Sequence, residues 1–95
     1  EVAVRMFPDD PTANINAAAI ELQQGNWKQA RRYLLKSDPQ AGATKNNEGV
    51  IYMMQGELDK AEALFQQAKA LGSAEAAKNL EEIAKKRQDN ALYGE

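Results

Sequence analysis

Apolar residues recur at helical spacing along most of the chain. Between Ile15 and Leu22 they fall at i, i+3, i+4 and i+7, which places them on one face of a helix. From Leu58 to Ala68 they fall at i, i+3, i+7 and i+10, which gives a second apolar seam. No segment alternates apolar and polar residues over a useful length, and β-branched residues are few. The pattern therefore predicts helices and no strands.

Two segments of the chain repeat each other. The shared pattern is Gln-Gly, one variable residue, an apolar residue, two variable residues and Ala, and it occupies residues 24–30 and 55–61. Gly25 of the first copy is matched by Gly56 of the second, 31 residues later, and a third copy begins at Asn79. Repetition at this period is the sequence signature of stacked structural repeats.

Cap and turn residues divide each copy into two helices. Asp10 is a good N-cap, and Pro11 suits the first helical position because its missing N–H would be unpaired there. Gly25, Gly56 and Gly72 each follow an apolar periodic segment and can end a helix in the left-handed conformation. We therefore expect antiparallel helix pairs stacked in a row. The expected units are the end of a preceding repeat helix at 1–8, repeat one at 11–41, repeat two at 42–72, a capping helix at 73–88 and a tail at 89–95.

The small and large apolar residues stand at places that resemble the tetratricopeptide repeat. The second copy has the Gly, Tyr, Ala, Phe and Ala of that repeat at Gly49, Tyr52, Ala61, Phe65 and Ala68. The first copy departs from it, with Glu21 in place of Tyr, Ser37 in place of Ala, and a second helix shortened before Pro39. The resemblance covers about residues 1–88. It implies an all-α fold, a short right-handed solenoid of about five to six helices.

The resemblance also implies a binding groove, because the first helix of each pair lines the inner surface in this family and binds a peptide or partner helix there. The implied groove residues are Ile15, Ala19, Leu22 and Gln23 in the first copy, Asn46, Asn47, Val50, Met53 and Met54 in the second, and Lys78 in the last helix, with Glu82 and Lys85 beyond it. Met side chains adapt to different partners. Met53 and Met54 also fit a different role, as core residues or as cover for the next helix.

Asn47 stands where some relatives hold the C-terminal carboxylate of a peptide. The flanking positions lack the Lys, Asn and Arg that complete such a clamp; they carry Ile15, Ala19, Glu75 and Asn79. A carboxylate with one neutral donor and an acid nearby is poorly stabilised. We therefore expect no carboxylate clamp, and we expect Asn16, Asn47 and Asn79 to bond backbone groups between helices.

Three further features have structural and functional interpretations. The single Trp, Trp27, has the phase of a packing position, although Trp is also frequent in binding hot spots. A basic ridge of Lys28, Arg32 and Lys36, with Arg31 adjacent, is either a solvated outer face or a docking site for an acidic partner. The basic run 85–87 can pair with the acids at 81 and 82, one helical turn away.

Composition narrows the possible functions. The 95 residues include 12 Lys and Arg, 14 Asp and Glu, and no His or Cys, for a net charge of -2. A dedicated nucleic-acid binder is disfavoured because no basic excess exists. Catalytic triads, thiol nucleophiles, thiolate or imidazole metal sites and disulfides are excluded. No acidic residue sits in an apolar segment that would shift its pKa towards neutrality, so we expect no enzyme active site and no cofactor. The longest apolar runs are too short to cross a bilayer.

These observations favour a non-enzymatic protein-interaction module that binds a peptide or partner helix in its groove. The alternative is an architectural spacer or a self-association segment that forms homo-oligomers through exposed repeat ends. The first residues have the pattern of a helix interior, so we expect a fragment of a longer protein. The turn and junction sequences resemble segments of larger bacterial cell-envelope proteins, which implies a periplasmic or outer-membrane-associated parent chain.

Overall fold

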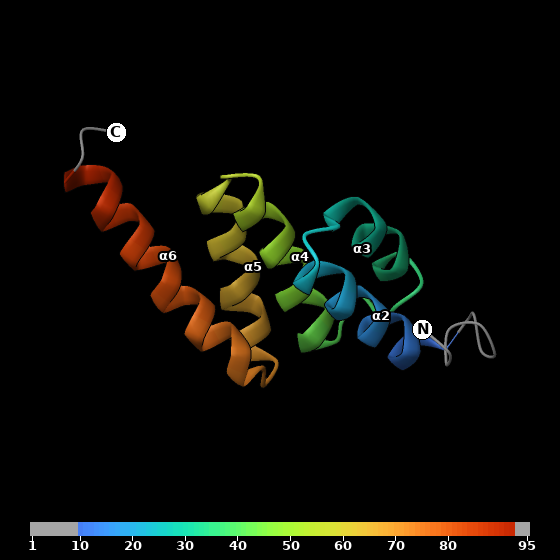
Figure 1. The fold of residues 1–95 in the computed structure, drawn as a ribbon. Helices are drawn as coiled ribbons and strands as arrows, with labels where there is room; N and C mark the ends of the chain where they lie inside the picture. Colours follow the sequence, from blue (N-terminus) through green and yellow to red (C-terminus); the bar gives the residue numbers. More distant parts are fainter. Residues whose placement is uncertain (1–9, 93–95) are drawn as a thin grey trace.

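The computed structural model describes residues 10–92, which form a row of helices in chain order (Figure 1). The helices are α2 (Pro11–Gln23), α3 (Trp27–Leu34), α4 (Gly42–Met54), α5 (Leu58–Ala70) and α6 (Ala74–Leu92). The expected all-α fold is confirmed. The preceding repeat helix expected at 1–8 lies outside the described residues.

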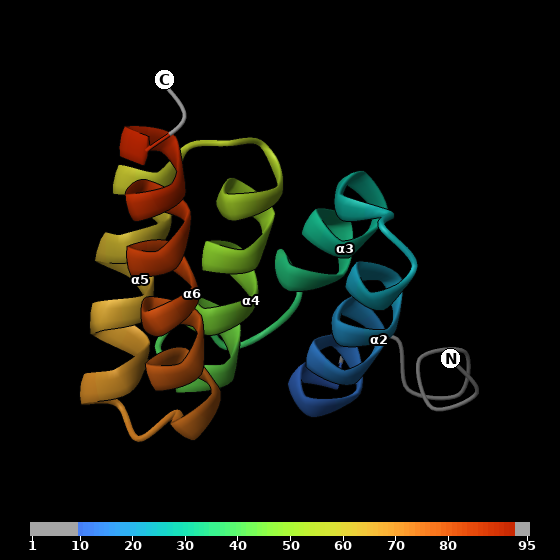
Figure 2. The same cartoon turned by 60° about the vertical axis from the view of Figure 1, so that its left-hand side comes forward.

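The helices form two hairpins followed by one long helix. Helices α2 and α3 pair, α4 and α5 pair, and α6 packs mainly on α5. Figure 2 shows α4, α5 and α6 side by side, with the α2–α3 hairpin next to α4. Both α2 and α4 have 13 residues, and α4 begins 31 residues after α2, as the repeat in the sequence predicts.

The predicted helix ends have a clear local cause. At the start of α2, the Asp10 carboxylate accepts hydrogen bonds from the backbone N–H groups of Thr12 at 2.9 Å and Ala13 at 3.5 Å. These bonds satisfy donors that have no partner inside the helix.

The turns inside the two hairpins are copies of each other. Gly25 and Gly56 have φ of 80° and 79°, a conformation that side chains disfavour. In the first turn the N–H of Asn26 bonds the carbonyl of Glu21 at 2.8 Å, and in the second the N–H of Glu57 bonds the carbonyl of Tyr52 at 2.9 Å. Each is the six-to-one bond of a Schellman motif. The repeated Gln-Gly pair thus reverses the chain in the same way twice.

The core consists of two clusters that lie one after the other along the row. The first contains Ala18, Leu22, Ala30, Leu34 and Ile51, and the second contains Ala61, Phe65, Ala68, Ala76 and Ile83. Val50 of α4 packs against both clusters, so it joins them. Of the apolar seam predicted for α5, Ala61, Phe65 and Ala68 are fully buried, and Leu58 at its start is half-buried.

In the second hairpin, Gly49 of α4 lies directly against the ring of Phe65 on α5. A Cβ atom on Gly49 would lie 2.5 Å from Cε1 of Phe65, which is far inside van der Waals contact. The ring of Phe65 therefore needs a residue without a side chain opposite it. In the first hairpin, Ala18 stands at the position of Gly49 and Leu34 at the position of Phe65. Leu is smaller than Phe, so this pair leaves room for the Cβ of Ala18.

Two features break the symmetry of the repeats. Helix α3 has 8 residues where α5 has 13. In the loop that follows α3, the Ser37 hydroxyl donates to the Leu34 carbonyl at 2.7 Å and lies 3.0 Å from the Thr44 hydroxyl, so these buried polar groups are paired. Helix α6 continues to Leu92, beyond the boundary expected at residue 88, because no Gly or Pro interrupts residues 74–92.

We predict that Gly49→Ala lowers the free energy of unfolding by about 1–2 kcal/mol, because overlap with Phe65 outweighs the better helix propensity of Ala. Phe65→Leu alone should cost about 1 kcal/mol through lost packing. The double variant recreates the Ala18–Leu34 pair and should recover part of both losses. Urea unfolding of the four proteins measures the coupling, and strict additivity of the two losses would contradict this account.

Candidate functional site

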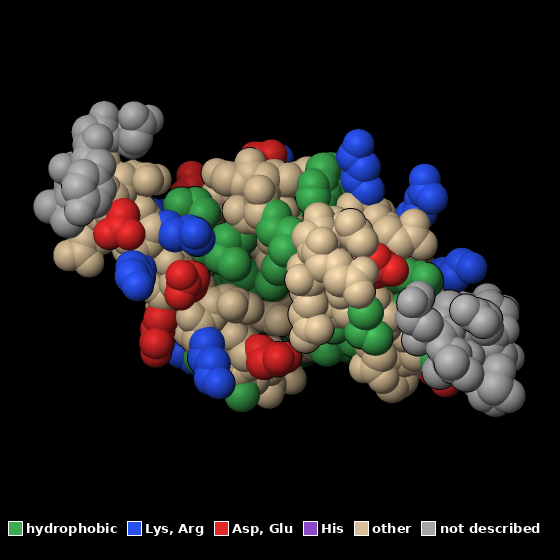
Figure 3. Space-filling model, in the orientation of Figure 1, with side chains coloured by type: hydrophobic (Ala, Val, Ile, Leu, Met, Phe, Trp, Pro, Cys, Tyr) green, Lys and Arg blue, Asp and Glu red, His purple; other side chains and the backbone are tan. Residues whose placement is uncertain are grey.

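The first helix of each hairpin and the start of α6 together line a shallow groove of about 350 Å³. We name it the α2–α4–α6 groove. Its lining residues are Ala19, Leu22 and Gln23 from α2, Asn46, Asn47 and Val50 from α4, and Glu75, Lys78 and Asn79 from α6. Figure 3 shows hydrophobic side chains in the middle of the molecule and charged side chains over α6.

The structure brings seven of the ten sequence-predicted groove residues together in this lining and leaves three outside it. Ile15 is half-buried and lies outside the lining. Met53 packs against the second core cluster, next to a separate hollow shared with Leu58 and the last turns of α6. Met54 is 44 % exposed. Met53 thus has the packing contact that the alternative interpretation describes.

The α6 side of the lining contains two residues that the sequence did not assign to the groove. Glu75 and Asn79 both line the groove beside Lys78. Glu75, Lys78 and Asn79 stand at i, i+3 and i+4 and therefore share one face of α6. This spacing, together with the prediction for Lys78, could have assigned Glu75 and Asn79 to the groove.

The polar part of the groove is built from side-chain amides. Asn79 Nδ2 donates to Asn46 Oδ1 at 2.9 Å, which joins α6 to α4 across the groove floor. Asn46 is only 4 % exposed, so this bond satisfies an acceptor that is nearly buried. The expected bond from Asn79 to a backbone group of another helix is wrong, because its partner is a side chain. For Asn47, which is buried, and Asn16, which is exposed, the bond to a backbone group stays a prediction.

The electrostatic character of the groove changes along its length. The α2 side offers the Gln23 amide and apolar surface from Leu22, whereas the α6 side offers Glu75 and Lys78, which have opposite charges. Amides donate and accept hydrogen bonds, as a peptide backbone does. Such a lining can pair with main-chain groups and needs no net charge on the bound segment.

Neither a metal site nor a membrane span is found in the described part of the chain. Within residues 10–92 no group of three or more acidic residues is arranged to hold a metal ion. Among the helices of that same stretch, none combines the length and apolar character needed to traverse a bilayer.

The sequence-predicted role of Trp27 agrees with its contacts. Trp27 is half-buried and packs against the first core cluster. Its ring also lies under two cations, with Arg31 Cζ at 5.2 Å and Lys28 Nζ at 5.7 Å from the ring centroid. Trp27 therefore anchors the start of α3 and does not line the groove.

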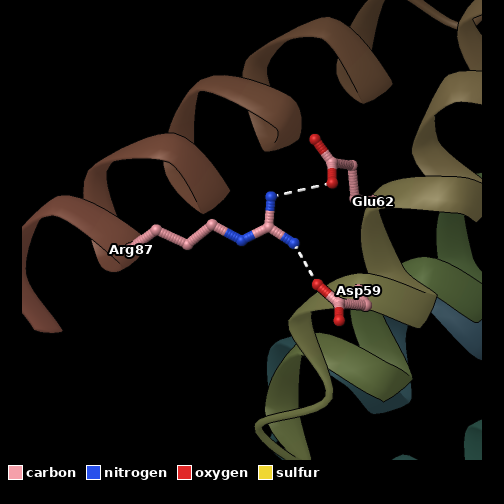
Figure 4. Close-up of polar contacts among 3 residues, drawn as sticks. All are labelled: Asp59, Glu62 and Arg87. Carbon is pink, nitrogen blue, oxygen red and sulfur yellow. Dashed lines mark hydrogen bonds and ion pairs between the residues drawn. The ribbon is translucent and has the colours of Figure 1, made fainter. Parts of the chain in front are cut away.

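Arg87 bonds a neighbouring helix, which differs from the pairing expected within α6. Its guanidinium donates to Glu62 Oε1 at 2.7 Å and to Asp59 Oδ1 at 2.5 Å, both on α5 (Figure 4). The hydrogen bond to Glu62 raises the pKa of the Arg87 guanidinium above its ordinary value. The expected local pairing with the acids at 81 and 82 is therefore wrong for Arg87. Its long side chain reaches α5, where two carboxylates converge.

The row of helical hairpins and the groove along their first helices define a helical-repeat protein. Residues 15–79 match the family model described as tetratricopeptide repeat. The match covers more than half of the chain, so this protein belongs to the tetratricopeptide repeat family. Repeats of this family are generally protein–protein interaction modules and are typically not enzymes. No curated protein and no solved structure matches the chain.

We predict that Arg87→Ala loosens the last turns of α6 without unfolding the hairpins. Backbone amides of residues 84–90 should exchange with solvent roughly threefold faster, because an exposed ion pair contributes modestly to stability. The difference from the unchanged protein should shrink at high salt. Lys86→Ala, which removes a neighbouring exposed cation, is the matched control. If the amides of residues 84–90 exchange at the same rate in both variants, the ion pairs of Arg87 with the α5 carboxylates do not hold the end of α6.

Proposed function

We propose that this domain binds a segment of a partner protein in the α2–α4–α6 groove. The observation that carries the proposal is the convergence of apolar and amide side chains from three helices on one hollow. Membership of a family of interaction modules supports it.

The lining suits an extended or helical segment that lies across the helices. Leu22 and Val50 offer apolar surface for the partner's side chains, and the small Ala19 lets a backbone approach closely. Gln23 and Asn47 can bond main-chain groups of the segment. The opposite charges of Glu75 and Lys78 sit at one end, where they can orient a segment that carries the complementary pair.

The proposed segment is internal to the partner and is not its C-terminus. Binding a terminal carboxylate needs several cationic or amide donors that converge. Lys78 is the one cation among the lining residues, and Glu75 lies beside it. The proposed function is binding without catalysis.

We predict that Ala19→Arg blocks the groove. Peptides are first selected from a random displayed library against the unchanged protein, and their affinities are measured by fluorescence anisotropy. The bulky Arg side chain should lower these affinities by about tenfold or more, because it fills the space a bound backbone needs. The matched control is Ala63→Arg, which makes the same change at an exposed position of α5 outside the groove.

Circular dichroism should show the same helix content in both variants. An equal loss of affinity in the two variants, or none in either, would contradict the proposal. The same samples test the architectural alternative by sedimentation at several concentrations. A dimer that Ala19→Arg dissociates would mean that a second copy of this chain, and not a partner segment, occupies the groove.

A further inference from the structure

A second hollow, of about 340 Å³, lies between α3, α4 and α5 and shares no residue with the α2–α4–α6 groove. We name it the α3–α5 pocket. Its lining residues are Arg31, Leu34, Leu35, Glu48, Ile51, Tyr52 and Leu64. The pocket is open because α3 ends at Leu34, after 8 residues, whereas α5 runs for 13. No further turn of α3 covers the neighbouring part of α4.

The pocket has an apolar floor and an apolar rim. Leu34 and Ile51 are almost fully buried and belong to the first core cluster. Leu35 follows α3 at the rim and is 81 % exposed, the highest value among the exposed large hydrophobic residues of the described chain. A single exposed Leu is ordinary on a protein surface. This one borders a hollow with an apolar floor, so a bound side chain could cover it and the floor together.

Helix α3 and the turn that follows it, beside the pocket, are strongly basic. Residues 27–37 contain Lys28, Arg31, Arg32 and Lys36 and no acidic residue, although the whole chain has a net charge of -2. In Figure 3 Lys and Arg side chains project from the upper right of the molecule, where Figure 1 places α3. Glu48 is the one acidic residue in the pocket lining. The local charge is thus opposite in sign to that of the chain as a whole.

Aromatic rings hold some of these cations in place. Arg31 Cζ lies 5.2 Å from the centroid of the Trp27 ring and 5.9 Å from that of Tyr52. Lys60 Nζ lies 5.5 Å from the centroid of the Tyr52 ring. Of these four residues Arg31 and Tyr52 line the pocket, so its cation contacts two rings and its ring contacts two cations. Because such contacts restrict the side chains beforehand, less conformational entropy is lost when a carboxylate binds them.

We propose that the α3–α5 pocket is a docking site for an acidic segment of another protein. One large apolar side chain of that segment enters the pocket over Leu34 and Ile51, against Leu35. The flanking carboxylates meet Arg31, Lys28 and Arg32 of α3 and Lys36 of the turn that follows; because α3 ends at Leu34, these cations do not form the single-helix ridge that the sequence predicts. The positive charge of this face selects an acidic partner. Burial of the apolar side chain on the pocket floor adds affinity and fixes the position of the segment, which charge attraction alone does not do. The proposal stands independently of the function proposed for the α2–α4–α6 groove.

The test uses a short synthetic peptide that is rich in Asp and Glu, has one central Phe and lacks Trp. Trp27 is the only Trp of the chain, so its fluorescence reports binding near Arg31. We expect saturable binding that weakens with added salt. Replacing the Phe of the peptide with Ser should weaken binding by about tenfold, because the apolar contact is lost.

The decisive comparison is between two double variants with the same change in net charge. Arg32→Glu with Lys36→Glu should weaken binding of the Phe peptide by about tenfold. Lys85→Glu with Lys86→Glu reverses two exposed cations on α6 and should leave it nearly unchanged. Leu35→Glu, at an exposed position, should also weaken binding and provides a test that leaves the cations intact.

Several results would overturn the proposal. Equal weakening by the two double variants would show a net-charge effect with no defined site. Equal affinity of the Phe and Ser peptides would show that nothing enters the pocket. Loss of binding in Ala19→Arg, with Leu35→Glu unaffected, would place the peptide in the α2–α4–α6 groove. Absence of any saturable binding would also contradict it.

Discussion

The close packing of α4 against α5 is the constraint on which the rest of the structure depends. The two helices can approach only because Gly49 leaves room for the ring of Phe65. That contact limits the distance between α4 and α5, and the second core cluster then joins α5 to α6 through Ala76 and Ile83. Val50, the next residue, packs against both core clusters and also lines the groove. The spacing that buries the core is thus the spacing that sets the shape of the binding surface.

Local signals in the sequence predict much of this fold. The hydrogen bonds around Gly25 and Gly56 that end α2 and α4 join residues at most five positions apart. Those by which Asp10 caps α2 join residues at most three positions apart. Neighbouring residues alone therefore determine these features. Because the sequence repeats after 31 residues, the bounds of α2 also predict those of α4. The groove was harder to predict, because the face that a residue occupies follows from helix phase, whereas its exposure depends on the next helix. Met53 illustrates the difference: its phase suits the groove, but contacts of α5 and α6 draw it to the second cluster.

Contacts made by long side chains between helices, and the pocket left by the difference in helix length, could not be predicted from neighbouring residues in the sequence. Arg87 finds its partners on α5, some 25 residues earlier in the chain, and no periodicity within α6 indicates them. Asn79 and Asn46 meet across two helices for the same reason. The shortening of α3 before Pro39 is visible in the sequence. Its consequence, a pocket against Ile51 and Leu64, becomes visible only when the longer α5 stands beside it.

Helix α4 lines both hollows, and this restricts how the groove and the pocket can be altered separately by mutation. Asn46, Asn47 and Val50 line the groove, whereas Glu48, Ile51 and Tyr52, interleaved with them, line the pocket. Between these two sets, Gly49 packs against the ring of Phe65 on α5. Because the two sets alternate along α4, a substitution in one set lies next to residues of the other. Only changes on the outer helices, at Ala19 of α2 or next to α3 at Leu35, alter one surface while the central helix keeps its place.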